Sequence, residues 1–172
     1  MMDQDTRLRP MVHADLATVL TWRNHPDVRR VMFNSDIIEH ADHVRWFDRA
    51  GADALRRLMV FERAGTPSGF VQLSFDPASA IGEWGFYAAP GAPKGTGRAM
   101  AKLALDYAFT DLKMHKMTAE VIESNSRSVD FHRRLGFVQE GFLRDQFKDA
   151  QGYHGVFRFG LLANEWLRNE DA

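Results

Sequence analysis

The chain has 172 residues, of which 45% are hydrophobic and 26% are charged, and its formal net charge is −1. This length and composition fit one globular domain, 1–172, with a core of its own. The near-zero charge argues against nucleic acid as a partner, since no excess of positive charge is available to hold a phosphate backbone. The chain has no cysteine, which excludes disulfides, thiolate zinc sites and cysteine nucleophiles.

No apolar run approaches the roughly 20 residues that span a bilayer, and the N-terminal sequence MMDQDTRLRP lacks the apolar core of a signal peptide. We therefore expect a cytoplasmic protein with no membrane partner. The sequence allows a homodimer through a strand edge or a helix face, and it selects neither.

The first third of the chain predicts one strand followed by short helices. The predicted elements are a strand at 6–11 and helices at 13–22, from Pro26 onward and at 39–49. Proline suits the first position of a helix, and Val28, Val31 and Met32 continue an apolar face at helical spacing.

From Leu58 onward the apolar period changes to that of strands. Three consecutive strands separated by turns at 64–67 and 76–77 are predicted, then a helix at 96–112, a strand at 115–122, a helix at 125–135, and two strands that meet at 148–152. This order predicts an α/β (α+β) fold.

The segment PKGTGRA, 93–99, lies between a predicted strand and a long helix. Glycines there can turn several backbone N–H groups toward one point at the positive end of the helix, which favours a phosphate. A lone GxG is also typical of a simple tight turn. A dinucleotide fold would place GxGxxG after the first strand, and a Walker lysine-serine pair is absent, so the remaining prediction is a pyrophosphate site.

The segment SNSRSVDFHRRLGF places Asn125 seven residues before His132, which precedes Gly136-Phe137 and a new strand. Together with the glycine loop, this pattern resembles the GCN5-related N-acetyltransferase (GNAT) superfamily. The resemblance implies a central, mixed, mostly antiparallel sheet of about seven strands flanked by helices, and acetyl-CoA as co-substrate without a metal. The coenzyme-binding residues that it implies are Phe86, Ala88, Lys94, Gly95, Thr96, Gly97, Arg98, Ala99, Asn125 and Ser128.

A narrower resemblance is to the acetyltransferases of pseudaminic acid biosynthesis, carried by WRNHPDVR at 22–29, GEWGFY at 82–87 and VFRFG at 156–160. It implies acetylation of the 4-amine of a UDP-linked 4-amino-4,6-dideoxy sugar that feeds flagellin or surface glycosylation. The substrate-binding residues that follow are Arg23, His25, His43, Gln72, Ser74 and Tyr87.

Acetyl transfer to an amine requires a neutral nucleophile and a proton for the departing thiolate. We expect Glu120 to act as the base and keep Glu83, on the neighbouring strand, as its rival. Tyr87 is expected to contact the sugar or the thioester carbonyl. His132 occupies the place of the superfamily's proton-donating tyrosine, and an unperturbed histidine pKa near ~6.5 suits that task. A bystander histidine on the helix surface is the alternative.

Two other acetyltransferase activities and one non-enzymatic role remain open. Groups that modify ribosomal-protein N-termini or polyamines share the NHPDV and Asn125 to Phe137 patterns. A polyamine site calls for acidic residues, whereas the N-terminal helices carry arginines and histidines that favour a diphosphate. A domain that binds coenzyme A without turnover is the last alternative. His40 and His43 are expected on a helix surface, so no metal site is predicted.

Overall fold

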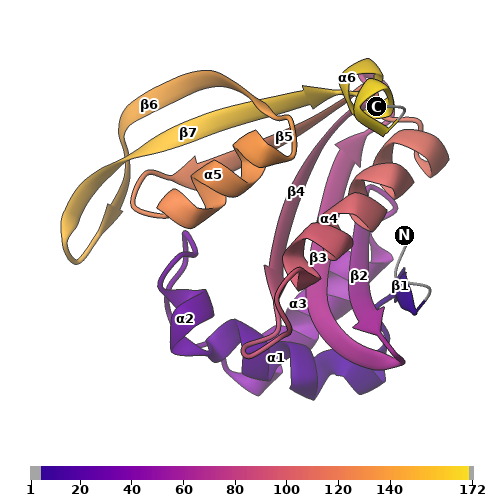
Figure 1. Ribbon diagram of the computed structural model, residues 1–172. Helices are drawn as coiled ribbons and strands as arrows, with labels where there is room; N and C mark the ends of the chain where they lie inside the picture. The colour runs from indigo at the N-terminus through magenta and orange to yellow at the C-terminus, as the bar shows by residue number, and fades with distance from the viewer. Residues whose placement is uncertain (1–4, 171–172) are drawn as a thin grey trace.

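A computed structural model describes residues 5–170 of the chain and the side chains of residues 5–166. Its centre is a seven-stranded sheet of order β1-β2-β3-β4-β5-β7-β6 (Figure 1). The strands are β1 (Thr6–Pro10), β2 (Arg56–Arg63), β3 (Thr66–Asp76), β4 (Ile81–Ala88), β5 (Lys116–Ile122), β6 (Val138–Asp149) and β7 (Gly152–Leu162). All neighbours are antiparallel except β4 and β5, which are parallel. The predicted α/β class with a mixed sheet of about seven strands is thus confirmed.

Helices cover both faces of the sheet (Figure 1). They are a 3₁₀ turn (His13–Asp15), α1 (Leu16–Asn24), α2 (Pro26–Arg29), α3 (His40–Ala52), α4 (Thr96–Asp106) with a π-helical turn (Tyr107–Asp111), α5 (Ser126–Arg134) and α6 (Ala163–Glu170). Helix α4 packs on one face, and α1 with α3 packs on the other. No helix of the described residues is long and apolar enough to cross a membrane.

Alternation along the central strands divides the core in two. Val71 and Leu73 of β3 pack toward α4, whereas Phe70 of the same strand joins Leu58 and Val60 beneath α1 and α3. Because strand β2 is covered on both sides, its sequence contains the continuous apolar run LMVF, 58–61, rather than an alternating pattern.

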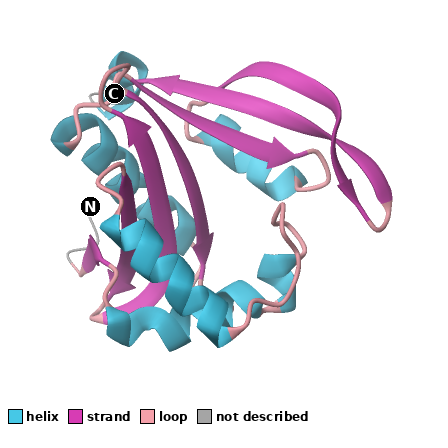
Figure 2. Cartoon of the chain, turned by 180° about the vertical axis from the view of Figure 1, so that it is seen from behind, coloured by secondary structure: helices cyan, strands magenta, loops and turns pink. Residues whose placement is uncertain are grey.

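Strands β4 and β5 are paired only at one end. Their register covers Ile81↔Lys116, Gly82↔Met117 and Glu83↔Thr118, after which the two strands diverge. The divergence opens a wedge between them, seen from behind in Figure 2. It divides the sheet into a part built by β1 to β4 and a part built by β5 to β7, with α5 beside the second part.

Three local features differ from the prediction. Helix α2 ends at Arg29 instead of continuing through Met32. Asn24 explains this early end, because its side chain hydrogen-bonds both backbone groups of Ile38 at 2.8 Å and draws the following chain, the 30–39 loop, back toward α1.

The other two differences lie at the ends of α4 and of the chain. Helix α4 ends in a π-helical turn closed by Leu112 N–H to Tyr107 O at 3.0 Å. Helix α6 was not predicted; it is anchored by Trp166, whose Nε1–H donates to Asp106 at 2.8 Å. A single tertiary hydrogen bond of this kind leaves no periodic signal in the sequence.

Candidate active site

The wedge leaves backbone donors of β4 without a partner strand. Ala89 N–H donates to Ser68 O at 2.8 Å. At this end of β4, the odd-numbered residues therefore direct their backbone hydrogen bonds toward β3. In an antiparallel ladder the intervening residues direct their N–H groups the opposite way. The N–H groups of Phe86 and Ala88 therefore point into the wedge, where they can polarise a carbonyl oxygen.

Six rings fill the closed part of the wedge on the side of α5, and we call them the wedge cluster. Its members are Trp84, Phe86, Phe131, His132, Phe137 and Phe159. His132 contacts every other ring in it; it stacks on Phe159 at 5.5 Å between centroids and meets Trp84 edge-on at 5.7 Å. Only 3% of His132 is exposed, so it is not the surface histidine of the alternative interpretation.

The hydrogen bonding of His132 fixes which tautomer its neutral ring adopts. Its Nδ1 lies 2.8 Å from Ser128 O, and since a carbonyl only accepts, Nδ1 carries the hydrogen. Nε2 then holds a lone pair that is buried and has no partner among the described residues. Burial lowers the pKa of His132, which favours this neutral ring. The general-acid role stays a prediction, because the neutral ring has no hydrogen on Nε2.

The glycine loop ends in backbone donors suited to an anion. Gly95 has φ of +91°, a left-handed conformation that glycine adopts without strain, and it precedes α4 without a side-chain cap. The first-turn N–H groups of Gly97 and Arg98 have no carbonyl partner within the helix. The buried hydroxyl of Thr96, 1% exposed, also has no hydrogen-bond partner within the described part of the chain. These unsatisfied donors at a positive helix end fit a pyrophosphate, with Lys94 and Arg98 exposed beside it.

Helix α5 begins beside this loop. Asn125 is its N-cap and accepts a hydrogen bond from Ser128 N–H at 3.2 Å. A Cβ on Gly97 would lie 3.8 Å from the Phe131 ring, so the start of α4 lies beside the middle of α5. Ala99 packs against the same core. The glycine loop and helix α5, which carry most of the residues predicted to bind the coenzyme, are thus in contact.

Two carboxylates share the face of the sheet opposite α4. Glu83 of β4 is in register with Thr118 of β5, and Glu120 follows two residues along β5 on the same face. Partial burial and the negative charge of Glu120 raise the pKa of Glu83. Glu120 itself accepts a hydrogen bond from Arg158 Nε at 2.8 Å. The sequence did not single out Arg158, which the register of β5 with β7 places opposite Glu120.

An open groove of about 410 Å³ adjoins Glu83. Its sheet side is lined by Ser74, Gly82, Glu83 and Thr118, and its rim includes Asp53 and Arg56 after α3. Ser74 pairs directly with Glu83, and Gln72 pairs with Gly85, so both predicted β3 residues share the face of Glu83. Glu83 is therefore accessible to an acceptor from this side.

A second group, the arginine cluster, consists of Arg23, Arg29, His43 and Tyr87. Arg23 Nη2 donates to Asn34 O at 2.5 Å and Arg29 Nη1 to Ser35 O at 3.0 Å, which holds the 30–39 loop. Arg23 Nη1 and Arg29 Nε are buried without a partner.

Burial governs the charges within the arginine cluster. Burial, with a further contribution from Arg29, lowers the pKa of Arg23, and burial raises the pKa of Tyr87. Arginine nevertheless stays charged at any physiological pH. Neither Arg23 nor Arg29 has a carboxylate partner among the described residues, so their positive charge is uncompensated.

His43 lies deeper in the same cluster and is 3% exposed, so the expectation that it lies on a helix surface was wrong. It stacks on Trp46 at 5.0 Å, hydrogen-bonds the backbone of Leu16, and keeps Nε2 buried without a partner. Burial lowers its pKa, so the neutral ring offers Nε2 as an acceptor. His25 instead caps α2, where its Nδ1 accepts from Asp27 N–H at 3.3 Å. In the described part of the chain no His, Asp and Glu side chains gather to hold a metal.

Comparisons with known proteins agree with this geometry. The family model of the GNAT acetyltransferase domain matches residues 5–138. Spermidine N(1)-acetyltransferase of Escherichia coli K12 is 28% identical over 94% of this chain and 88% of its own length. Acetyltransferase PseH of Campylobacter jejuni strain 81-176 is 26% identical over 81% of this chain and 83% of its own length.

A crystal structure of spermidine N-acetyltransferase from Vibrio cholerae in complex with CoA and spermine superposes with a TM-score of 0.89 at 26% identity. The match covers 95% of this chain and 99% of that one. The glycine loop, the wedge and α5 thus belong to a fold that binds coenzyme A in a relative. The chain belongs to the GNAT family and is an acetyl-CoA-dependent N-acetyltransferase that acts on an amine.

Proposed function

We propose that the acceptor is the 4-amine of a UDP-linked 4-amino-4,6-dideoxy sugar, as in pseudaminic acid biosynthesis. The observation that carries the proposal is the arginine cluster, in which two buried guanidinium donors lack a carboxylate partner among the residues that the structure describes. Burying such donors unpaired is costly, so their natural complement is an anion that arrives with the substrate. A diphosphate meets this need, whereas a cationic polyamine would be repelled at this place.

The sugar would lie between the arginine cluster and Glu83. Tyr87, at the end of β4, belongs to the cluster, while Glu83 lies four residues earlier on the same face of that strand. His43 Nε2 is an acceptor suited to a sugar hydroxyl or amide N–H. Gln72 and Ser74 line the intervening sheet. An acceptor bound at the cluster by its diphosphate would therefore extend its amine toward Glu83.

The coenzyme supplies the acetyl thioester, and this chain's residues position it. The N–H groups of Gly97 and Arg98 with the Thr96 hydroxyl would hold the pyrophosphate, and Asn125 with Ser128 would face the pantetheine arm. The N–H groups of Phe86 and Ala88 would bind the thioester oxygen, where charge develops as the amine attacks. Holding both substrates across the wedge adds the advantage of proximity.

We propose Glu83 as the group that takes the proton of the attacking amine. A base works best when its pKa approaches the working pH, and the pKa of Glu83 is raised. Glu120, the first expectation, has one carboxylate oxygen bound by Arg158. We assign Glu120 a supporting role. Its negative charge raises the pKa of Glu83, and Arg158 holds the Glu120 carboxylate in place. His132 stays the proposed proton donor to the departing thiolate; it must first take up a proton at Nε2 to do so.

Polyamine acetylation is the second candidate, and the relatives named as spermidine acetyltransferases favour it. Acetyl-CoA-dependent thiol release decides between the two when UDP-4-amino sugar, spermidine and an N-terminal peptide are compared at equal concentrations. We expect kcat/KM for the UDP-sugar to exceed the others by at least about tenfold. A preference for spermidine or peptide would overturn the proposal. Coenzyme binding without turnover of any acceptor would indicate the non-catalytic alternative.

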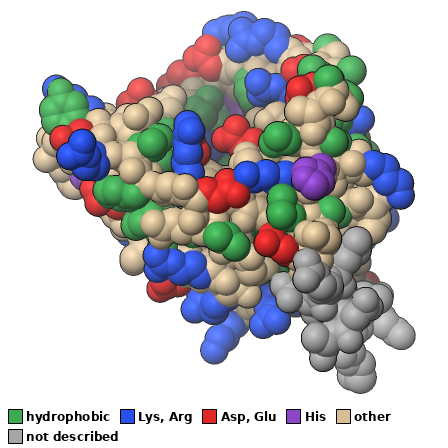
Figure 3. All heavy atoms as spheres, turned by 90° about the horizontal axis from the view of Figure 1, so that it is seen from above, with side chains coloured by type: hydrophobic (Ala, Val, Ile, Leu, Met, Phe, Trp, Pro, Cys, Tyr) green, Lys and Arg blue, Asp and Glu red, His purple; other side chains and the backbone are tan. Residues whose placement is uncertain are grey.

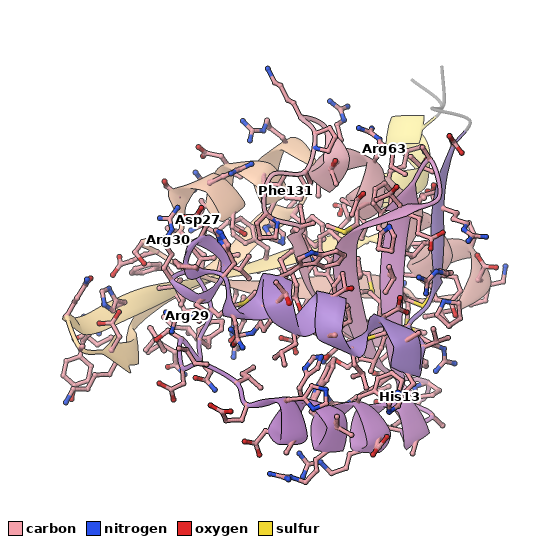
Figure 4. All side chains as sticks on the ribbon, turned by 90° about the horizontal axis from the view of Figure 1, so that it is seen from below. His13, Asp27, Arg29, Arg30, Arg63 and Phe131 are labelled. Carbon is pink, nitrogen blue, oxygen red and sulfur yellow. The ribbon has the colours of Figure 1, made fainter. Side chains whose placement is uncertain are left out.

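A variant of the arginine cluster tests the observation directly. Arg23→Gln removes charge-assisted hydrogen bonds worth about 1.5–3 kcal/mol, so KM for the UDP-sugar should rise about 10- to 100-fold while KM for acetyl-CoA stays within about twofold. Arg30→Gln is the matched control. Arg30 pairs only loosely with Asp27, at 3.5 Å, and projects from a different side of α2 than Arg29 (Figure 4). Equal effects of the two changes would count against the diphosphate site.

A further inference from the structure

An exposed aromatic residue stands next to the arginine cluster. Phe33 of the 30–39 loop is 47% exposed. Its ring meets Phe147 of β6 edge-to-face, with centroids 5.4 Å apart, and Phe147 in turn lies 6.0 Å from the His154 ring. This row of rings joins the 30–39 loop to the β6–β7 hairpin, two segments far apart in the sequence.

The loop places Phe33 beside the proposed diphosphate. Asn34, the next residue, accepts the hydrogen bond of Arg23, and Ser35 accepts that of Arg29. The buried donors without partners belong to those same two guanidinium groups. In a nucleoside diphosphate one ribose separates the phosphates from the base. A diphosphate on Arg23 and Arg29 therefore leaves its base within reach of the Phe33 ring.

Phe33 has the properties of a stacking platform. An exposed apolar residue alone is common and needs no explanation. Phe33 differs because Phe147 fixes the orientation of its ring, while almost half of the residue remains open to solvent. A preoriented ring face is what a nucleobase stacks on, and such stacking does not depend on the identity of the base.

We propose that Phe33, oriented by Phe147, is a specificity-determining residue that stacks on the pyrimidine of the nucleotide carried by the acceptor. The proposal rests on the proposed function, since it assumes a nucleotide-linked acceptor. It divides recognition into two parts. The arginine cluster binds the diphosphate, and Phe33 selects acceptors that carry a base over those with a phosphate alone.

The test compares two acceptors that share the same amino sugar, one linked to UDP and one to a single phosphate. Phe33→Leu keeps an apolar contact with Phe147 but removes the aromatic face. KM for the UDP-sugar should rise about 5- to 100-fold, as expected for the loss of one base–aromatic stack. KM for the sugar 1-phosphate and for acetyl-CoA should stay within about twofold. Phe33→Tyr, which keeps the ring, should retain the KM of the unchanged protein.

Phe142→Leu is the matched control, because Phe142 is an exposed phenylalanine of β6 that packs on Phe157 instead of the loop. It should change neither KM. A rise of both KM values with Phe33→Leu would show that Phe33 only holds the loop, and no rise in either would also overturn the proposal. If the unchanged protein does not acetylate the UDP-sugar, the proposed function fails first, which distinguishes the two failures.

Discussion

Glu83 and Glu120 show how two chemically identical side chains acquire different roles from their neighbours. Glu83 faces an open groove with a raised pKa, whereas Glu120 is bound by Arg158. Alternation along β4 and β5 places both carboxylates on one face, and this much could be read from the sequence. The ion pair that separates them depends on β7, which meets β5 only in the folded sheet.

Replacing the proposed base gives the first prediction. Glu83→Gln should lower kcat/KM by about 10²- to 10⁴-fold, the range typical of a lost general base. Glu83 acts only when deprotonated, so its raised pKa moves the acidic limb of the pH–rate profile above the usual carboxylate range, and activity increases as the pH rises through that limb. Steady-state thiol release from pH 5 to 9 measures both the loss of kcat/KM and the position of the acidic limb. If Glu120→Gln is the more damaging change, the base is Glu120.

His132 gives the second prediction, which concerns stability. Its lowered pKa means that the unfolded chain binds a proton before the folded protein does as the pH falls below about 6.5. The unfolding free energy should therefore fall between pH 7.5 and pH 5 by more than in His132→Phe. Urea unfolding at the two pH values measures the difference. His43, whose pKa is also lowered, is present in both proteins, so the comparison isolates His132.

The same variant tests the proposed acid role. If His132 protonates the thiolate, His132→Phe should lower kcat more than it weakens coenzyme binding. Equal kcat values would leave His132 as a packing residue of the wedge cluster. The spacing from Asn125 to Gly136 located His132 on its helix, but it contained no information on burial, because the rings that enclose His132 come from β4, β7 and α5.

At the start of α4, the same substitution is expected to stabilise the helix and to weaken coenzyme binding. Ala at position 97 would be favoured over Gly in a helix by about 0.5–1 kcal/mol, and its Cβ would meet the Phe131 ring at an ordinary 3.8 Å. The same methyl group would obstruct the pyrophosphate. Gly97→Ala should thus unfold at a higher temperature without coenzyme, yet bind acetyl-CoA about tenfold more weakly or worse.

Calorimetric unfolding and titration with acetyl-CoA measure these two quantities. Gly51→Ala in α3 is the control, because its Cβ would meet no atom within 4 Å and it lies outside the proposed sites. It should gain stability without a loss of coenzyme affinity. A Gly97→Ala protein that binds acetyl-CoA normally would remove the glycine loop from the pyrophosphate site.

Sequence periodicity predicted the helices and strands, but it did not predict where each of them ends. The strands β2 to β4 and the helices α3 to α5 were predicted because apolar spacing repeats over many residues. Helix α2 was predicted too long, because Val31 and Met32 fit a helical face while Asn24 draws the chain away. Ends of this kind depend on one or two hydrogen bonds between residues distant in the chain, which periodicity does not record.

Acidic and basic side chains are interspersed on the face seen in Figure 3, in keeping with the net charge of −1. A homodimer stays a prediction, as do the single domain and the cytoplasmic location. Strand β6 is an edge strand that exposes Val138 and Phe142. The overall family and its chemistry could be predicted because the motifs follow a fixed order along one fold.

Coenzyme binding should stabilise the folded protein as a whole. The proposed coenzyme residues lie on both sides of the wedge, so a bound coenzyme would join the two parts of the sheet. At 100 times its Kd, acetyl-CoA should add about 2.7 kcal/mol, which raises Tm by about 5–10 °C in a chain of this length. Differential scanning calorimetry measures the shift. A shift below about 2 °C at that saturation would contradict binding of acetyl-CoA to the folded protein alone.

The short pairing between β4 and β5 also has a consequence for biosynthesis. Strands β1 to β4 are consecutive in the chain and each pairs with the next, so a nascent chain can assemble them before β5 has left the ribosome. Only three residue pairs then connect β5 to that earlier ladder. Helix α5 and strand β7, which carries Phe159 of the wedge cluster, are translated afterwards, so the protein becomes competent to bind its coenzyme only near the end of its synthesis.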